Sequence, residues 1–284
     1  MAETRPSIAD KRRAFQQLHL AGCFVIPNPW DVGSARYLQS LGFKALATTS
    51  SGFAWSRGHP DGAVSRDMAL AHLRDIVAAA DVPVNADFES GFAPDAAGVA
   101  ESVRLAVETG VAGLSIEDST GDASEPLYEL GAAVERIRAA RKAIDKAGGD
   151  TLLVGRAECF LVGRPDLDET IARLKAYAQA GADCLYAPGI RIRDQIAAVV
   201  AGVAPKPLNL LVGSASDLTM QEIAALGVRR VSVGGALARS AWGGFMHAAR
   251  LIAEQGKFDG FANAASGQEL NSLFRDDLKK LGSQ

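Results

Sequence analysis

Two acidic residues follow a short stretch of strand-forming residues early in the chain. The segment 82–92, VPVNADFESGF, places Asp87 and Glu89 just before a flexible Gly91. In a parallel barrel, strands that end in carboxylates bring them to one mouth, where their oxygen atoms can bind a hard cation. Acids at a strand end also often only cap the next helix. By itself, the segment leaves both interpretations open.

Further acids and one arginine follow two later stretches that we expect to be strands. Glu117 and Asp118 end one stretch, and Arg156 and Glu158 end the next. Bringing ionised carboxylates together away from water is costly unless a cation or hydrogen-bond donors compensate them. Arg156 can neutralise one acid, and the surplus suits Mg²⁺, which takes a few carboxylate oxygens and keeps water ligands. The alternative is salt bridging alone, with Glu158 only orienting Arg156.

A run of hydroxyl side chains follows the second expected strand. The run 48–51, TTSS, offers hydroxyl and amide donors suited to a carboxylate or phosphoryl group, or it forms only a solvated turn. The loop beyond it contains His59 and Asp61. His59 could act as a general acid or base, although a lone histidine in a loop is more often simply exposed. Asn209 adds a polar side chain near the end of the seventh expected strand.

Alternating strand-like and helical segments must position these residues. Helix-ending glycines recur before the expected strands, which favours βα units. A doubly wound sheet is the competing fold, but Asn28-Pro29-Trp30-Asp31 after the first strand is not a Gly-rich phosphate turn. Eight similarly spaced units therefore favour a (β/α)8 barrel. The expected strands are 23–27, 45–48, 82–86, 112–117, 152–156, 184–187, 207–211 and 230–233, and the helices between them lie near 31–40, 65–79, 95–109, 130–147, 168–180, 192–202 and 217–226.

Helices are also expected before and after the barrel. Residues 7–20 predict an amphipathic lead-in helix, and 236–255 and 268–281 predict two C-terminal helices joined by a loop. We expect one domain over 1–284, with the barrel at about 23–235 and the C-terminal helices at about 236–281. Trp242, Phe245, Met246 and Leu251 form an apolar stripe that either the chain's own barrel or a second subunit must cover.

Composition limits the class of protein. A hydrophobic fraction of 48% with only 6% aromatic residues is typical of an Ala-, Val- and Leu-rich α/β protein, and a net charge of −3 argues against a nucleic-acid partner. The three cysteines share no C-x-x-C spacing, which fits a reducing compartment. Because no apolar stretch reaches secretory or membrane-spanning length, we expect a soluble, cytoplasmic protein with no membrane partner.

Several motifs occur together in a characteristic order. This ordered set resembles the isocitrate lyase and phosphoenolpyruvate mutase superfamily from about residue 24 to about residue 235. Each motif alone is modest, whereas the set in this order is specific. The motifs are NPWDVGSARYL, TTSSGFAWSRGHPDG, VNADFESGF, GLSIEDS, VGRAECFLVG and GADCLYAPG.

The resemblance implies a barrel whose eighth helix is exchanged between subunits of a dimer or tetramer. It also implies Mg²⁺, with Mn²⁺ as an alternative ion, and a 2-oxo acid or phosphonate substrate. The chemistry would make or break a C–C or P–C bond through a metal-bound enolate or enol.

Carried over by position, the resemblance also assigns residues. Asp87 and Glu117 match metal-site acids, and Asp61 matches an acid that reaches the metal through water. Arg156 matches the arginine on the substrate. To the catalytic residues we add Glu89 and Glu158, and to the substrate-binding residues Asn209. The segment that binds the substrate's carboxylate or phosphonyl group corresponds to Thr49, Ser50 and Ser51.

Two departures from the superfamily pattern concern function. Many members have Asp-Ala-Asp where this chain has Asn85-Ala86-Asp87 with two extra residues before Gly91, so one acid is missing and Glu89 is the candidate replacement. The lyases carry Lys-x-Cys-Gly-His in the loop after the fourth strand, but loop 119–130, STGDASEPLYEL, contains no Cys, Lys or His. The basic, Asn-containing loop of the mutase is absent as well.

The resulting hypothesis is a Mg²⁺-dependent lyase that cleaves a small 2-oxo-carboxylate, such as an oxaloacetate-like or phosphonopyruvate-like compound. One alternative is a P–C enzyme similar to a phosphonomutase or a phosphonopyruvate hydrolase. The other is a 2-oxo acid binding protein that has lost turnover together with the motif of its gating loop.

Overall fold

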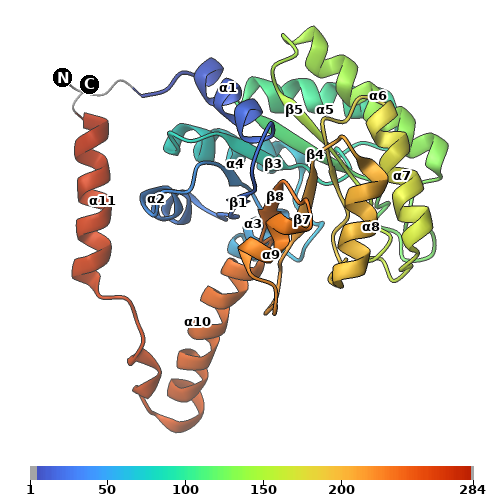
Figure 1. Ribbon diagram of the computed structural model, residues 1–284. Helices are drawn as coiled ribbons and strands as arrows, with labels where there is room; N and C mark the ends of the chain where they lie inside the picture. Colours follow the sequence, from blue (N-terminus) through green and yellow to red (C-terminus); the bar gives the residue numbers. More distant parts are fainter. Residues whose placement is uncertain (1–4, 283–284) are drawn as a thin grey trace.

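Eight short parallel strands lie at the centre of the computed structural model, which describes residues 5–282 (Figure 1). Residues 1–4, the start of the N-terminal stretch interpreted above, and residues 283–284 lie outside the described part. Hydrogen bonds join the strands in the order β1-β8-β7-β6-β5-β4-β3-β2. One more backbone bond, from the N–H of Ala47 to the C=O of Pro27 at 3.0 Å, spans β2 and β1 and nearly closes the barrel. The strands are β1 (Phe24–Ile26), β2 (Leu46–Ala47), β3 (Val84–Asp87), β4 (Gly113–Glu117), β5 (Leu152–Arg156), β6 (Cys184–Tyr186), β7 (Leu208–Leu211) and β8 (Arg230–Ser232).

Helices surround this barrel and confirm the predicted (β/α)8 fold. The expected helices are found with small shifts at their ends, and left-handed glycines such as Gly110 (φ 89°) and Gly181 (φ 109°) follow them where predicted. The helices are α1 (Ile8–Leu18), α2 (Val32–Ser40), α3 (Ser50–Ser56), α4 (Arg66–Ala79), α5 (Ala96–Glu108), α6 (Leu130–Lys146), α7 (Leu167–Gln179), α8 (Arg193–Val203), α9 (Met220–Ala225), α10 (Ala236–Gln255), the 3-10 turn η1 (Asp259–Phe261) and α11 (Gly267–Gly282).

Helix α3 was not predicted, because the hydroxyl run after β2 was interpreted as a loop. Thr49 is its N-cap, and the Thr49 hydroxyl accepts a hydrogen bond from the N–H of Gly52 at 3.3 Å. The helix has only seven residues, too few for a hydrophobic period to be recognised. Its first turn directs Ser50 and Ser51 to the same barrel mouth as the strand ends.

The main apolar core lies between the strands and the outer helices, and α1 contributes Phe15 to a second, smaller cluster against the strands. Phe15 of α1 is fully buried and packs with Ile26, Ala45 and Ala112. Gly113 makes room for it, since a Cβ there would lie 2.7 Å from the Phe15 ring and 2.8 Å from Oδ1 of Asn85.

The C-terminal helices leave much of the apolar stripe on α10 exposed. In Figure 1, α10 extends away from the barrel, and Ala238 is its one buried residue. Trp242 is 38% exposed and Phe245 is 63% exposed. Helix α11 returns to α2, where Arg36 and Asp277 form a 3.0 Å ion pair. Within residues 5–282, no helix has the length and hydropathy needed to span a membrane.

Candidate functional site

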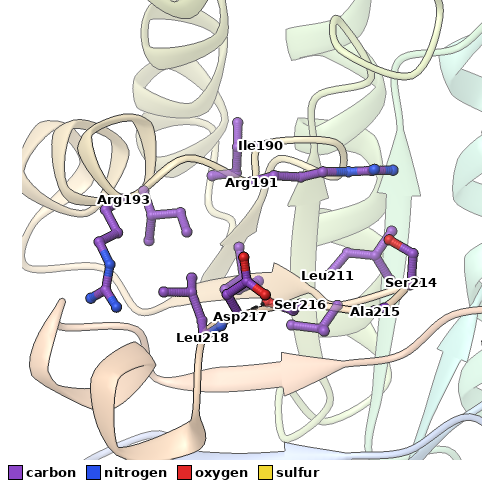
Figure 2. A pocket seen from close by; sticks show the side chains of 13 residues that line it. Ile190, Arg191, Arg193, Leu211, Ser214, Ala215, Ser216, Asp217 and Leu218 are labelled. Atoms are coloured by element: carbon purple, nitrogen blue, oxygen red, sulfur yellow. Dashed lines mark hydrogen bonds between the residues drawn. The ribbon is translucent and has the colours of Figure 1, made fainter.

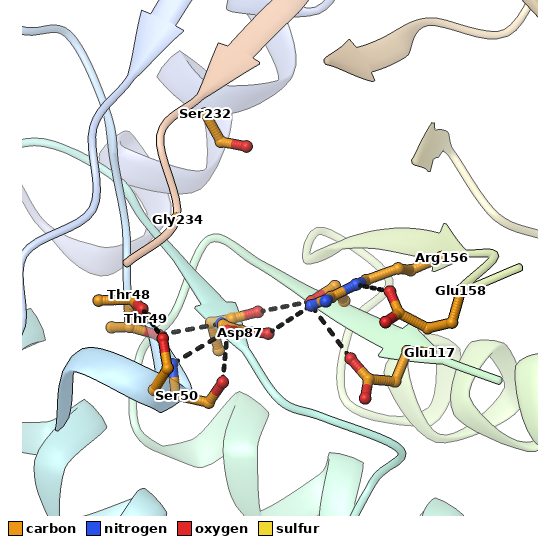
Figure 3. A network of polar contacts seen from close by, with 12 residues as sticks. Thr48, Thr49, Ser50, Asp87, Glu117, Arg156, Glu158, Ser232 and Gly234 are labelled. Atoms are coloured by element: carbon orange, nitrogen blue, oxygen red, sulfur yellow. Dashed lines mark hydrogen bonds and ion pairs between the residues drawn. The ribbon is translucent and has the colours of Figure 1, made fainter. Parts of the chain in front are cut away.

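Three acids surround the side chain of Arg156 at the C-terminal mouth of the barrel (Figure 3). Its Nη1 atom lies 3.1 Å from Oδ1 of Asp87, at the end of β3, and 3.0 Å from Oε2 of Glu117, at the end of β4. Its Nε atom pairs closely with Oε1 of Glu158, just after β5. The side chains of Arg156, Asp87, Glu117 and Glu158 are all less than 20% exposed. Neighbouring parallel strands thus bring the predicted residues together, as their common strand ends require.

The N-terminus of α3 contacts the same cluster from the other side. Both the N–H and the hydroxyl of Ser50 donate to Oδ2 of Asp87, at 3.0 and 2.8 Å. The N–H of Asp87 donates to the hydroxyl of Thr48 at 2.9 Å. One Asp87 oxygen therefore receives the donors of α3 and the other receives Arg156, which fixes the carboxylate in the mouth.

A cavity of about 190 Å³ lies beside this cluster and reaches into the barrel. Several predicted residues line it from different loops and strands, namely Thr49, Ser50, Ser51, Asp61, Asp87, Arg156 and Asn209. Glu89 instead lines a smaller adjoining void together with Asp87. Glu117 and Glu158 connect to the main cavity through Arg156. His59 is exposed and lies outside these lining residues.

The crowding of acids changes their protonation. Burial, together with the nearby Asp87 and Asp61, raises the pKa of Glu89 to about 7, while Arg156 opposes the shift. Burial also raises the pKa of Glu117 well above its ordinary value, although Arg156 acts to lower it. The pKa of Asp61 is raised by burial and by Asp87. The single positive charge of Arg156 does not balance this many carboxylates. A bound divalent cation would supply the missing positive charge.

The donor set fits a hard cation that uses few protein ligands. Carboxylate oxygens are the atoms that Mg²⁺ prefers, and it commonly takes one or two of them and completes its shell with water. Among residues 5–282, no three acidic, histidine or cysteine side chains form a ready metal shell. The guanidinium of Arg156 occupies the space between Asp87, Glu117 and Glu158. A cation there would therefore be held by one or both of Asp87 and Glu117 and by water rather than by a closed protein cage.

Comparison with known proteins decides the family. The family model of phosphoenolpyruvate phosphomutase matches residues 15–253. The chain belongs to the phosphoenolpyruvate mutase/isocitrate lyase superfamily. Its relatives are enzymes that act on C–C or P–C bonds, as the sequence motifs had predicted.

Individual relatives give the range of the similarity. A solved structure from Burkholderia cenocepacia J2315, described no more closely than as a lyase/mutase, is 50% identical with a TM-score of 0.91, over 94% of this chain and 97% of that one. An oxaloacetate decarboxylase from Bradyrhizobium sp. (strain BTAi1 / ATCC BAA-1182) is 32% identical over 72% of this chain and 70% of its own. Oxaloacetate acetylhydrolase, solved with its product oxalate, is 26% identical with a TM-score of 0.84, over 97% of this chain and 98% of that one.

Asn85, where the superfamily pattern has an acid, lies below the rim of the mouth. It lies two residues before Asp87 on β3, so its side chain points into the barrel one layer below the mouth. It is 2% exposed, and its Oδ1 atom accepts a 3.4 Å hydrogen bond from Arg230. The acids that β3 and its turn bring to the mouth are Asp87 and Glu89, and the chain turns at Glu89 with a φ of 47°. The departure at Asn85 therefore concerns the floor of the cavity rather than its rim.

The cavity floor contains a buried guanidinium that the sequence analysis did not identify. Arg230 is 2% exposed, and in the described part of the chain no carboxylate pairs with it. Its Nε atom donates to Oδ1 of Asn209 at 2.8 Å, and Nδ2 of Asn209 donates to Ser232 at 3.0 Å. Asn209 thus lines the cavity with its amide already hydrogen bonded on both sides. A period-two pattern from 230 to 232 could have indicated that Arg230 faces inward.

Two further residues stabilise the mouth through hydrogen bonds within the protein, and one of them, Asn28, also lines the main cavity. Asp118, next to Glu117 and pointing the opposite way, accepts the N–H of Glu158 at 2.8 Å, Nη1 of Arg173 at 3.1 Å and the hydroxyl of Tyr177 at 2.5 Å. Asn28 accepts the N–H groups of residues 233 and 234 at 2.9 Å each, joining the ends of β1 and β8. The NPW motif was the available signal for Asn28.

Proposed function

We propose that the chain is a Mg²⁺-dependent lyase that cleaves a C–C bond of a small 2-oxo-carboxylate by way of an enolate. The observation that carries this proposal is that Arg156 forms ion pairs with both Asp87 and Glu117 beside a cavity of about 190 Å³. A cavity of this size suits an acid of a few carbon atoms, and the superfamily relatives include proteins named for reactions of oxaloacetate.

The residues present are suited to the cation, with Mn²⁺ as an alternative because it accepts the same oxygen ligands. Asp87 and Glu117 would hold it, and Asp61 would contact one of its waters. When bound, the cation supplies positive charge that stabilises an oxygen atom on which negative charge develops.

The protein side chains have separate roles in stabilising charge, binding the substrate and transferring a proton. Arg156 offers donors to the same developing charge, and Glu158 fixes its orientation through the Nε contact. The first turn of α3, with Thr49, Ser50 and Ser51, supplies hydroxyl and amide donors for the substrate's carboxylate. Asn209 contributes to the wall of the cavity. Glu89, which lies beside Asp87 in the adjoining void, is the carboxyl group that we assign to proton transfer.

Substitution at the cluster tests this assignment. Purified protein is assayed for release of product from oxaloacetate and related 2-oxo acids, with Mg²⁺ or with EDTA. Asp87→Ala and Arg156→Ala are expected to abolish turnover, since each removes a partner of the cluster. His59→Ala is the control, because His59 is exposed and lies outside both cavities. Undiminished turnover in either cluster variant contradicts the site.

Two observations favour alternatives that the same protein can test. Loop 119–130 carries no Cys, Lys or His, which favours a 2-oxo acid binding protein without turnover. Calorimetric binding of oxalate, pyruvate or 2-oxoglutarate with no product across the panel would support that role. The family match to a phosphomutase favours P–C chemistry, as in a phosphonomutase or a phosphonopyruvate hydrolase. Phosphorus NMR would detect phosphate or a rearranged phosphonate.

For the assembly, we propose one domain per chain and a cytoplasmic homo-oligomer, a dimer or a tetramer. The exposed stripe of Trp242, Phe245 and Met246 on α10 supports this, because large apolar side chains gathered on one protruding helix call for a partner surface. Exchange of α10 between subunits would cover it. Light scattering of the wild type and of Phe245→Glu tests the proposal, since the charged variant should shift toward the monomer, and a monomeric wild type contradicts it.

A further inference from the structure

The guanidinium of Arg230 at the cavity floor contacts only neutral side chains. Arg230 is 2% exposed and lines the cavity of about 190 Å³. Its Nε atom donates to Oδ1 of Asn209 at 2.8 Å, and Nη1 donates to Oδ1 of Asn85 at 3.4 Å. Within residues 5–282, its Nη2 atom makes no hydrogen bond. One of the bonds is therefore short, and the two N–H groups of Nη2 remain for another acceptor.

The third neighbour of this guanidinium, His19, does not carry a charge. Its Nδ1 atom donates to the C=O of Phe15 at 2.8 Å, so Nε2 is an acceptor, 3.5 Å from Nη1 of Arg230. Burial, together with the charge of Arg230, lowers the pKa of His19 to about 3. A guanidinium cannot lose its proton in this way, because it stays charged throughout the accessible pH range. The positive charge at the floor is therefore permanent.

The other buried arginines in residues 5–282 show how this fold satisfies a guanidinium. Arg12 and Arg173 each pair with a carboxylate, at 2.9 and 3.1 Å. Arg136 instead donates to the C=O groups of residues 90, 93 and 94 at 2.6, 2.8 and 3.1 Å, and it lies over an aromatic ring. Arg230 has neither a carboxylate nor a set of carbonyl groups. A charge buried in this way is costly unless another anion compensates it.

The acids at the mouth of the same cavity are already engaged. Oδ1 of Asp87 lies 3.1 Å from Arg156, and Oδ2 accepts two hydrogen bonds from Ser50. Arg230 is the first residue of β8 and lies two residues before Ser232, one layer deeper in the barrel. The other polar side chains that the strands contribute to the cavity are neutral, namely Asn85, Ser115, Tyr186, Asn209 and Ser232.

We propose that the cavity floor binds one small monovalent inorganic anion, of the size of chloride, beside Arg230. One fixed positive charge among neutral amide and hydroxyl groups requires one negative charge, and the free N–H groups of Nη2 can donate to it. A chloride ion needs about the space of one water molecule. The organic acid is assigned to the rim, at Arg156 and the first turn of α3, so the two ligands occupy different layers. The anion site does not depend on which reaction the protein catalyses.

Anomalous diffraction from bromide-soaked crystals locates the site in the wild type. Bromide is the probe because it resembles chloride and its anomalous signal identifies it. A peak is expected in hydrogen-bonding contact with Nη2 of Arg230. The absence of a peak there overturns the site. A peak that appears only at molar bromide also overturns it, since that result shows an adventitious ion only.

Broadening of the chloride line in the NMR spectrum measures binding in solution. The wild type should broaden the line, and Arg230→Met should lose most of the effect. Arg191→Met is the control, because Arg191 lines a different cavity of about 320 Å³ between the loops after β6 and β7 (Figure 2), where it forms no ion pair with the described residues. It should retain the broadening. Equal loss in both variants overturns the site.

Two measurements on the wild type alone keep the proposal testable if Arg230→Met does not fold. Raising chloride from about 10 to about 100 mM, with gluconate holding the ionic strength constant, should lower the unfolding constant in urea by up to about 10-fold. An unfolding constant that does not depend on chloride contradicts the proposal. In calorimetry with Mg²⁺, chloride should not compete with oxalate. Competition would place both ligands in one site and would overturn a separate anion site.

Discussion

Replacement of Asp118 by alanine should destabilise the fold by about 3 kcal/mol and also disturb the site. The Asp118 carboxylate is almost fully buried and accepts hydrogen bonds from Arg173, Tyr177 and the N–H of Glu158. Removing one partner of a buried ion pair costs about 3–5 kcal/mol. Arg173 keeps Glu169 at 2.8 Å and the C=O of residue 128 at 2.9 Å, which places the expected loss at the lower end.

Urea unfolding followed by tryptophan fluorescence measures this loss, at one fixed protein concentration because assembly contributes to stability. Asp118→Asn is the matched variant. It keeps the volume and one acceptor for the N–H of Glu158 but removes the charge, so its loss should be smaller and its kcat/KM closer to the wild type. A loss below about 1 kcal/mol in Asp118→Ala would refute the reasoning, since a buried ion pair could not then hold the loop after β5.

Three other predictions concern a buried histidine, a packed glycine and the central arginine. Burial lowers the pKa of His72 to about 4, so below pH 6.5 the unfolded chain binds a proton that folded His72 does not, and His72 should contribute a fall in stability of about 3 kcal/mol between pH 6.5 and pH 4. His72→Leu should show a shallower fall in urea unfolding, and an unchanged fall would contradict this origin. Gly113→Ala should lose about 1–3 kcal/mol because its Cβ meets Phe15 at 2.7 Å, whereas Gly131→Ala, with nothing within 4 Å, should lose far less. Arg156→Lys keeps the charge but not the contacts to three acids, so kcat/KM should fall about 100-fold; a fall below threefold would show that charge alone suffices.

Much of the site could be predicted because parallel strands end at one mouth. The runs before Asp87, Glu117 and Arg156 were recognisable as strands, so these side chains were expected together. In the structure, Nη1 of Arg156 lies 3.1 Å from Asp87 and 3.0 Å from Glu117. Helix α3 was not predicted because its seven residues are too few to show a helical pattern of apolar residues.

Layer depth inside the barrel could not be predicted, since it depends on strand register. The sequence comparison identified Asn85 only as the position of a missing acid, and the structure adds that β3 places it one layer below the mouth, against Arg230. The direction of Asp118 was, in contrast, available from strand alternation, because neighbouring residues on a strand point to opposite faces. Glu117 reaches Arg156 in the mouth, and Asp118 reaches Arg173 on the outside.

The central claim is that a divalent cation and Asp87 act together on a 2-oxo acid. The most direct measurement is the turnover of a 2-oxo acid panel by wild type and Asp87→Ala, after EDTA treatment and again after addition of Mg²⁺. The account predicts that EDTA abolishes turnover, that Mg²⁺ restores it in the wild type, and that Asp87→Ala stays inactive at every Mg²⁺ concentration. Full turnover in EDTA, or wild-type turnover by Asp87→Ala, would contradict it.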